Sequence, residues 1–303
     1  MNIPDFRGEL KLNEPLSKHT SFSIGGPCDA LAAPLDRDDL VTLLKHLAGE
    51  RLPYFILGGG TNLLVRDGGF RGVMITLERL NEIRIDREYR SVGGAFAVVH
   101  AGAGAGLPRL LTYAVDHGLT GLEFATGIPG TVGGAICMNA GTADGEIGDI
   151  VESVTLVSPA GETSANGKEQ LGFRYRTAKI PDGHCITDIK VVLRRSEKAR
   201  IKNRVKELMD KRKQFQPAGL PSAGSVFKNP QDEAAGKLIE AVGLKGRTAG
   251  NAQISEKHAN FIVNRGDARA KDVLALMKIV TEKVLEARGV RLEPEITIIG
   301  EDS

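Results

Sequence analysis

The chain has 303 residues, of which 41% are hydrophobic and 26% are charged, and its formal net charge is +2. These values are ordinary for a globular protein of two domains or one large domain, and they argue against disorder, collagen-like repeats and a membrane bundle. The balanced charge and an aromatic content of 5% argue against nucleic acid as a partner. The N-terminus lacks the pattern of a secretory signal, and no apolar run reaches the roughly 18 residues that span a bilayer. We therefore expect a cytoplasmic protein that does not engage a membrane.

Cysteine and histidine are few and scattered. The three cysteines (Cys28, Cys137 and Cys185) are odd in number and far apart in the sequence, which fits neither a disulfide framework nor a zinc motif. No His-x-x-x-His pair occurs among the six histidines. We expect free thiols and no metal.

Strand-like and helix-like patterns alternate in the first half of the chain. Residues 36–47 begin with an aspartate and then carry leucines at helical spacing, which predicts a helix. The other elements expected here are strands at 54–57, 73–77, 97–101 and 151–157, and a helix at 108–117 with a proline in its first turn.

The pattern changes near residue 197. Residues 197–213 carry eight Lys or Arg and three Asp or Glu beside one apolar stripe, which predicts an amphipathic helix with a basic face. That face is either simply solvated or attracts an anionic ligand. We place a domain boundary here, giving domains 1–197 and 198–303. Further on we expect strands at 225–228, 260–263 and 292–299, and helices at 233–242 and 270–288.

Three glycine-rich segments could bring backbone close to a phosphate. Residues 102–106 follow a strand and precede a helix, but the third glycine is one residue early for a dinucleotide fingerprint, so a tight turn explains them better than a Rossmann motif. Residues 58–65 contain three consecutive glycines followed by Thr61 and Asn62, which can form an anion nest or an ordinary turn. Residues 127–135 are also glycine-rich. Two such loops without a P-loop lysine favour a large dinucleotide over a hydrolysed triphosphate.

Several motifs, taken in order, resemble the UDP-N-acetylenolpyruvoylglucosamine reductase (MurB) family. They are His19-Thr20-Ser21-Phe22-Ser23-Ile24-Gly25-Gly26, the loops at 58–65 and 127–141, Tyr175-Arg176, the run from Ala223 to Pro230, the run from Ile254 to Asn260, and Leu292-Glu293-Pro294-Glu295. The resemblance extends from about residue 12 to residue 300. It implies an α+β fold, with a two-lobed FAD-binding domain of the vanillyl-alcohol-oxidase (PCMH) type followed by a smaller α/β substrate-binding domain. The 49-residue step from Arg176 to Ser225 resembles the shorter variant of the family, which lacks an inserted substrate-capping loop.

The resemblance also implies a reaction and a set of site residues. FAD, held without a covalent bond, would pass reducing equivalents from NADPH to UDP-N-acetylglucosamine enolpyruvate and give UDP-N-acetylmuramate, a cytoplasmic step of peptidoglycan precursor synthesis. The implied cofactor-binding residues are Gly58, Gly59, Gly60, Thr61, Asn62 and Leu63 in one loop and Gly127, Ile128, Pro129, Gly130, Thr131, Gly133 and Gly134 in the other. The implied substrate-binding residues are Tyr175, Lys228, Asn229 and His258.

Three residues would carry the chemistry. Arg176 would stabilise negative charge on the substrate carboxylate, Ser225 would donate a proton to the adjacent carbon, and Glu295 would assist next to that carboxylate. Each also has an ordinary structural explanation: a surface charge, a backbone cap, and a pair on an edge strand. Two other functions stay open, an oxidase or dehydrogenase acting on an alcohol with the same FAD fold, and a non-catalytic nucleotide-sugar sensor.

Overall fold

The computed structural model describes residues 3–303, which form two compact units. The first unit comprises the chain up to Lys11, Ala30–Gly59 and Gly72–Arg212; the second comprises Leu12–Asp29, Gly60–Arg71 and Lys213–Ser303. This division differs from the expected boundary at residue 197. The reason is that helix α6 (Lys198–Phe215) buries Ile201 in the hydrophobic core of the first unit, so most of that helix belongs there.

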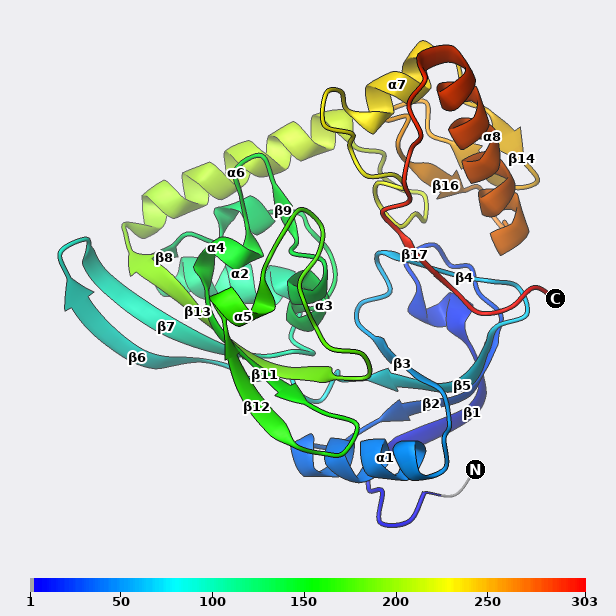
Figure 1. Cartoon of the computed structure of the whole chain (residues 1–303). Helices are drawn as coiled ribbons and strands as arrows, with labels where there is room; N and C mark the ends of the chain where they lie inside the picture. Colours follow the sequence, from blue (N-terminus) through cyan, green and yellow to red (C-terminus); the bar gives the residue numbers. More distant parts are fainter. Residues whose placement is uncertain (1–2) are drawn as a thin grey trace. The chain divides into compact units, whose positions relative to one another are not determined.

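The largest sheet lies in the first unit and is antiparallel (Figure 1). β13 forms its centre, with β11 on one side and β7 on the other. The strands in spatial order are β12 (Thr163–Gly167), β11 (Val151–Val157), β13 (Cys185–Arg195), β7 (Gly94–Gly102) and β6 (Ile83–Ser91), with the short β8 (Leu119–Thr120) also paired with β13. An antiparallel partner on both sides of β7 excludes the parallel sheet of a Rossmann fold.

A four-stranded sheet forms the other part of this unit. Its order is β1 (Glu9–Pro15), β2 (Pro27–Ala33), β5 (Phe70–Thr76) and β3 (Tyr54–Leu57), and β3 runs parallel to β5. Strands β1, β2 and β5 each contain residues of both units. Helix α1 (Arg37–Gly49) begins at Asp36, whose side chain accepts from the N–H of Asp39, and buries its leucines in the same core as residues of β2 and β5.

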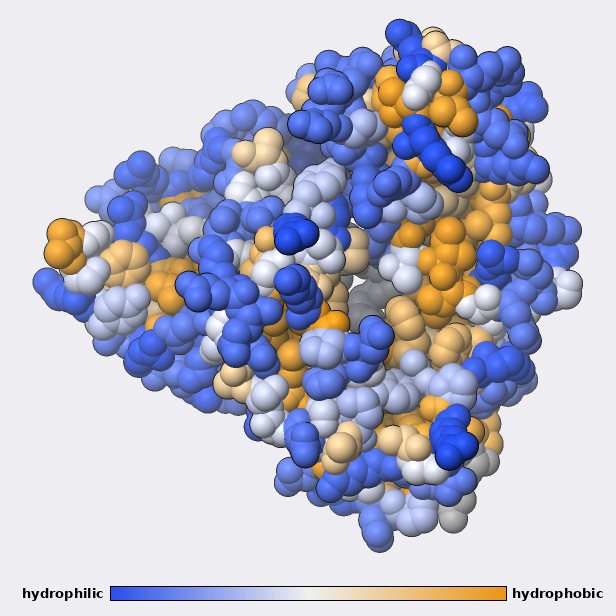
Figure 2. Space-filling view, in the orientation of Figure 1, coloured by the Kyte–Doolittle hydropathy of each residue, from blue (hydrophilic) through white to orange (hydrophobic). Residues whose placement is uncertain are grey.

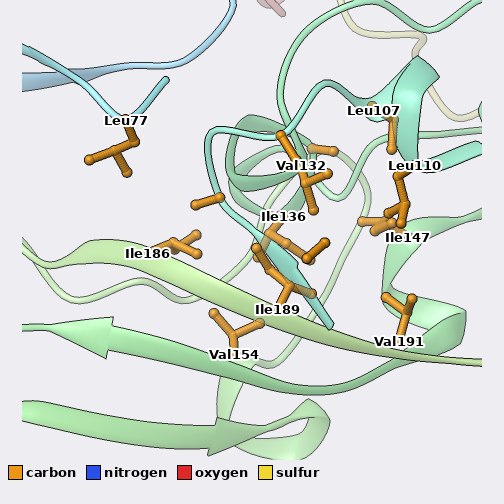
Figure 3. Packing of buried hydrophobic residues seen from close by; sticks show 14 of the residues in the cluster. Leu77, Leu107, Leu110, Val132, Ile136, Ile147, Val154, Ile186, Ile189 and Val191 are labelled. Atoms are coloured by element: carbon orange, nitrogen blue, oxygen red, sulfur yellow. The ribbon is translucent and has the colours of Figure 1, made fainter. Parts of the chain in front are cut away.

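Short helices complete the core of the first unit. α2 (Leu107–Asp116) and α3 (Val132–Cys137) turn apolar side chains such as Leu110, Val132 and Ile136 toward Ile189 of β13 and Val154 of β11 (Figure 3). Full burial of each such side chain stabilises the fold by about 1.5–3 kcal/mol. The remaining small elements are a 3-10 turn (Glu123–Ala125), β9 (Gly141–Thr142), β10 (Gly145–Glu146), α4 (Ile147–Ile150) and α5 (Lys168–Leu171).

Hydrophilic residues cover most of the face shown in Figure 2. One exception is an apolar group at the tip of the β6–β7 hairpin, where Val92 in the turn is fully exposed. Within residues 3–303, none of the helices combines the length and apolar character that a membrane span requires.

The second unit contains an antiparallel sheet and two helices. The sheet is ordered β14 (Thr248–Ala249), β15 (Ala252–Ile254) and β16 (Ile262–Asn264), and the helices are α7 (Ala235–Ala241) and α8 (Ala270–Arg288) (Figure 1). A separate parallel pair joins β4 (Leu63–Val65) to β17 (Thr297–Ile299), and a 3-10 turn covers Leu16–His19. The pair places the segment that follows the Gly58–Gly60 loop beside the C-terminal segment.

Most predicted elements are confirmed. The strands at 54–57 and 151–157 and the helix at 270–288 have the expected bounds, and the other first-half elements are present with shifted ends. Two predictions were wrong. Residues 225–228 form only isolated bridges, because the side chain of Asn260 bonds both backbone groups of Phe227 in place of a strand partner. The last strand is limited to Thr297–Ile299, and Leu292–Ile296 is irregular around Pro294. The strand predicted at 260–263 is present as β16, which begins two residues later and ends one residue later.

Candidate active site

In the first unit the two glycine loops pack directly against each other. A Cβ on Gly59 would lie 2.6 Å from Cα of Gly130, and a Cβ on Gly58 would lie 2.9 Å from Oγ1 of Thr131. That threonine also begins α3 by accepting from the N–H of Gly134 over 3.2 Å. Gly58 and Gly59 are nevertheless exposed on their other side. The backbone of Gly58 and Gly59 is therefore open to a ligand.

The third glycine segment supports this arrangement. The N–H of Leu107 donates to the carbonyl of Gly130, and the N–H of Gly133 donates to the carbonyl of Ala103, both over 2.9 Å. A Cβ on Gly104 would lie 1.7 Å from the carbonyl oxygen of Leu77. The glycines at 102–106 thus allow a tight turn against protein backbone, as the sequence favoured, and the turn carries the second glycine loop.

Arg212, near the end of α6, lies over the start of that loop. A Cβ on Gly127 would lie 3.0 Å from Cδ of Arg212. The NH1 group of Arg212 donates to the carbonyl of Thr126 over 3.0 Å. Burial lowers the pKa of Arg212 from its ordinary value, and the nearby charge of Arg176 lowers that pKa further. The guanidinium remains charged at neutral pH. Two positive groups therefore lie close to the Gly127 loop.

Arg176 occupies a tight turn formed by residues 174–177. Its φ is +56°, in the left-handed region, and its NH1 donates to the carbonyl of Gly141 over 3.1 Å. The guanidinium lies 5.1 Å from the ring centroid of the exposed Tyr175, a cation–π contact. Arg176 is partly buried and hydrogen-bonded to the protein. It is therefore not the freely solvated surface charge that the sequence alone would allow.

The rest of the first glycine loop belongs to the second unit. Gly60 has a φ of +61°, and a Cβ there would lie 2.0 Å from the carbonyl oxygen of His19, so only glycine fits. The side chain of Asn62 donates to the backbone carbonyl of Glu295 over 3.1 Å. The backbone carbonyl of Asn62 accepts from the N–H of Thr297 over 2.9 Å. Asn62 thus connects the loop to the segment of the predicted acid. Thr61 is partly exposed and Leu63 is buried.

Ser225 and Glu295 lie on neighbouring backbone segments of the second unit. The N–H of Glu295 donates over 2.7 Å to the carbonyl of Val226, the residue next to Ser225. Ser225 also forms a bridge with Phe261, and Gly224 before it has a φ of +76°. Ser225 and Glu295 are both partly exposed. The structure therefore brings two of the three predicted catalytic residues together.

The three candidate substrate contacts in the second unit also have structural partners. Nζ of Lys228 is 3.5 Å from Oε2 of Glu293, and Oδ1 of Asn229 accepts from the N–H of Ala235 at the start of α7. His258 is half-buried, and its Nδ1 accepts from the N–H of Asn260 over 3.3 Å, which places the proton of the neutral ring on Nε2. Burial lowers the pKa of His258 from its ordinary value.

Sequence reasoning missed Arg212 as a separate residue. It recognised the basic helix and its possible attraction for an anion, but eight basic side chains share that segment and nothing in the spacing distinguishes Arg212. His19 was also missed as a neighbour of the Gly58–Gly60 loop, because it precedes Gly60 by many residues. Its imidazole is bonded to Oε1 of Glu14 over 3.0 Å.

These groups fit a dinucleotide cofactor. Exposed glycine backbone suits a diphosphate, because successive N–H groups can approach it without side-chain obstruction. Arg176 and Arg212 add positive charge in the first unit. Loops of this kind on an α+β scaffold, without a Rossmann turn, fit an FAD-binding flavoprotein.

Comparison with known proteins identifies the family. The model "FAD binding domain" matches residues 28–165, and the model "UDP-N-acetylenolpyruvoylglucosamine reductase, C-terminal domain" matches residues 216–299. The chain is 42% identical over 295 residues to the UDP-N-acetylenolpyruvoylglucosamine reductase of Clostridium kluyveri, covering 97% of this chain and 94% of that one. It is 44% identical over 304 residues to the enzyme of the same name from Desulfosudis oleivorans, covering 98% and 96%.

A solved structure agrees. The crystal structure of the MurB enzyme of Thermus caldophilus matches with a TM-score of 0.79 and 38% identity, covering 96% of this chain and 98% of that one. The chain belongs to the UDP-N-acetylenolpyruvoylglucosamine reductase (MurB) family. The fold class expected from the sequence is confirmed, as is the FAD-binding domain.

Proposed function

We propose that this chain catalyses the reduction by NADPH, through non-covalently bound FAD, of UDP-N-acetylglucosamine enolpyruvate to UDP-N-acetylmuramate. The reaction is a cytoplasmic step in the synthesis of peptidoglycan precursors, and it involves neither nucleic acid nor a membrane. The structural observation that carries the proposal is the bond of 2.7 Å between the N–H of Glu295 and the carbonyl of Val226, because it holds an acid beside the segment of Ser225. Family membership over nearly the whole chain supports the same activity.

The chemistry explains why these residue types are needed. The two glycine loops would hold FAD, which when bound would supply the hydride taken from NADPH. When hydride adds to the terminal vinyl carbon of the enol ether, negative charge develops on the carbon next to the carboxylate and spreads into that carboxylate. A fixed positive group or hydrogen-bond donor stabilises this charge, and a proton must then reach the carbon.

Arg176 and Ser225 supply these two functions. The planar guanidinium of Arg176 binds the carboxylate and stabilises the charge, while the hydroxyl of Ser225 donates the proton. Glu295 lies beside the substrate carboxylate in this proposal. Because two carboxylates repel each other, Glu295 assists either as the protonated acid or through a hydrogen-bond donor that both groups share. Tyr175, Lys228, Asn229 and His258 contact the nucleotide sugar, and His258 donates through Nε2.

The competing functions have less support. In many oxidases with this FAD fold a histidine or cysteine tethers the flavin. The histidine nearest the Gly58–Gly60 loop in the second unit, His19, uses its imidazole to bond Glu14. A non-catalytic sensor would not need the reactive set of Arg176, Ser225 and Glu295. The segment between Arg176 and Ser225 holds β13, α6 and their connections, which agrees with the shorter variant.

Two measurements test the proposal. The purified protein should be yellow, and acid precipitation should release all the colour to the supernatant; colour retained in the pellet would contradict non-covalent binding. With FAD bound, NADPH should be consumed steadily only when the enolpyruvyl nucleotide sugar is present. Consumption with an alcohol or sugar substrate in its place, or none with the enolpyruvyl compound, would contradict the proposed activity.

A further inference from the structure

Asn139 is fully buried just after α3, and its side chain joins two segments of the first unit. Nδ2 donates to the carbonyl of Arg174, and Oδ1 accepts from the N–H of Gly148, both over 3.0 Å. These partners fix the orientation of the amide, because a carbonyl can only accept and an N–H can only donate.

The carbonyl that Asn139 contacts is the one that closes the turn of Arg176. It also accepts from the N–H of Thr177 over 3.1 Å, while the N–H of Arg174 donates to the carbonyl of Thr177 over 3.0 Å. These bonds enclose Tyr175 and Arg176. The φ of +56° at Arg176 is one that residues with a side chain rarely adopt, so the turn depends on support from its surroundings.

The segment around Asn139 provides that support at three points. Besides the amide contact, the N–H of Ala178 donates to the carbonyl of Cys137 over 3.2 Å, and Arg176 itself donates to the carbonyl of Gly141 over 3.1 Å. Asn139 has a φ of +41°, which asparagine tolerates better than most residues. At the other two points this segment contributes only backbone carbonyls, so only the amide contact depends on the side chain at position 139.

We infer that Asn139 is a positioning residue for Arg176: its buried amide holds the 174–177 turn so that the guanidinium faces the charge that develops on the substrate. This inference rests on the proposed role of Arg176. An error of about 1 Å in such a group can cost about 100-fold in rate, so a residue that never touches substrate can control the chemical step.

Asn139→Asp isolates the contact. Aspartate accepts a positive φ and keeps an acceptor for Gly148, but it places an oxygen against the carbonyl of Arg174 where the amide donated. Asn166→Asp is the matched control, because Asn166 makes its side-chain contacts to Ser164 near the edge of the sheet. Both variants make the same chemical change in the same unit.

The experiment measures the two half-reactions of the holoenzyme by rapid-mixing absorbance of the flavin band. For Asn139→Asp we expect full flavin content and a rate of flavin reduction by NADPH within about twofold of the parent, with flavin reoxidation by the enolpyruvyl sugar about 10- to 100-fold slower. Asn166→Asp should match the parent in both. Equal slowing of both half-reactions by Asn139→Asp would overturn the inference.

A double-mutant cycle with Arg176→Ala separates the inference from the proposed function. If Asn139 acts through Arg176, Asn139→Asp has no further effect on reoxidation in the Arg176→Ala background. Effects that multiply would overturn the positioning role and leave the role of Arg176 intact. Unchanged reoxidation in Arg176→Ala alone would overturn the proposed role of Arg176, and the positioning role with it.

A variant that leaves the backbone angle unstrained covers the case in which Asn139→Asp does not retain flavin. Asn139→Gly accepts the φ of +41° and lacks both side-chain contacts, so it can replace Asn139→Asp in the same cycle. Loss of flavin from both variants would show that Asn139 supports the fold in general and would overturn the positioning role.

Discussion

The side-chain amide of Asn62 donates to the backbone carbonyl of Glu295 over 3.1 Å. One residue thereby belongs to the loop proposed to hold FAD and also fixes the segment of a proposed catalytic acid. The bond between Thr297 and the carbonyl of Asn62 strengthens the same connection, as does the parallel pairing of β4 with β17. The proposed cofactor loop and the segment of the proposed acid are therefore joined directly within the second unit.

Replacement of Asn62 should affect both properties. Asn62→Asp would set a carboxylate oxygen against the carbonyl of Glu295, and the loss of such a contact costs about 1–3 kcal/mol. We expect weaker FAD binding by fluorescence titration together with slower flavin reoxidation by substrate. Asn81→Asp, at an exposed asparagine, is the control. A variant that weakens neither FAD binding nor reoxidation would show that the contact is unimportant.

Gly59→Val should weaken FAD binding for a steric reason. The φ of Gly59 is not in the left-handed region, so backbone strain does not contribute. A Cβ would instead lie 2.6 Å from Cα of Gly130 and push the two loops apart. Overpacking of this kind costs about 1–3 kcal/mol, so the affinity for FAD should fall by about 5- to 150-fold. Gly49→Val is the control, because a Cβ at Gly49 has nothing within 4 Å. Equal FAD affinity in Gly59→Val and the parent would place the binding loop elsewhere.

Ser225→Ala should slow only the second half of the cycle. The substitution removes the proposed proton donor without adding bulk or charge, and general acid catalysis typically contributes about 10²–10⁴-fold. Flavin reoxidation by the enolpyruvyl sugar should fall by that factor, while flavin reduction by NADPH stays near the parent rate. Ser222→Ala, in the same segment, should leave both rates unchanged, since it is the carbonyl of Ser222 that accepts from Ser21. Slowing of both halves by Ser225→Ala would assign Ser225 to the fold or the flavin site.

His258 should make the protein less stable as the pH falls. Burial lowers its pKa in the folded state; the backbone and Glu240 partly oppose this effect, and Lys245 adds to it. The unfolded chain takes up a proton below about pH 6.5, whereas the folded protein resists protonation, so the stabilisation is complete above that pH and is lost as the pH falls through it. Urea unfolding at about pH 7.5 and about pH 5 should show a smaller loss of stability for His258→Gln than for the parent.

A second histidine contributes to the pH dependence in that experiment. Some dependence should also remain in His258→Gln, because burial lowers the pKa of His100 in the same direction. An identical pH dependence in His258→Gln and the parent would contradict the perturbed pKa.

The sequence predicted those helices and strands whose apolar residues recur at regular spacing and pack into one hydrophobic core. The helix at 270–288 has an apolar face at helical spacing and ends before Gly289, whose φ is +68°, so its bounds followed from the sequence. The strand predicted at 225–228 is absent because the backbone of Phe227 bonds to the side chain of Asn260. Hydrophobic periodicity carries no signal for such a contact. β13 was missed although its alternating hydrophobic residues gave a strand signal.

The candidate site likewise contains features that the sequence reveals and contacts that only the structure reveals. The glycine loops were evident from their composition, and the family resemblance named Ser225 and Glu295. The contacts of Asn62, Asn139 and Arg212 join residues that are far apart in the chain, and each residue type has many equivalents in the sequence. The sequence had already named Asn62 in the glycine loop, but only the folded structure shows these contacts and selects Asn139 and Arg212.

The most direct test of the proposed activity is a single turnover without NADPH. The holoenzyme is reduced under anaerobic conditions, freed of reductant and mixed with one equivalent of UDP-N-acetylglucosamine enolpyruvate. The account predicts that the absorbance of oxidised flavin returns and that one lactyl ether forms for each flavin. Flavin that stays reduced in the presence of this substrate, or reoxidation without the lactyl product, would contradict the account.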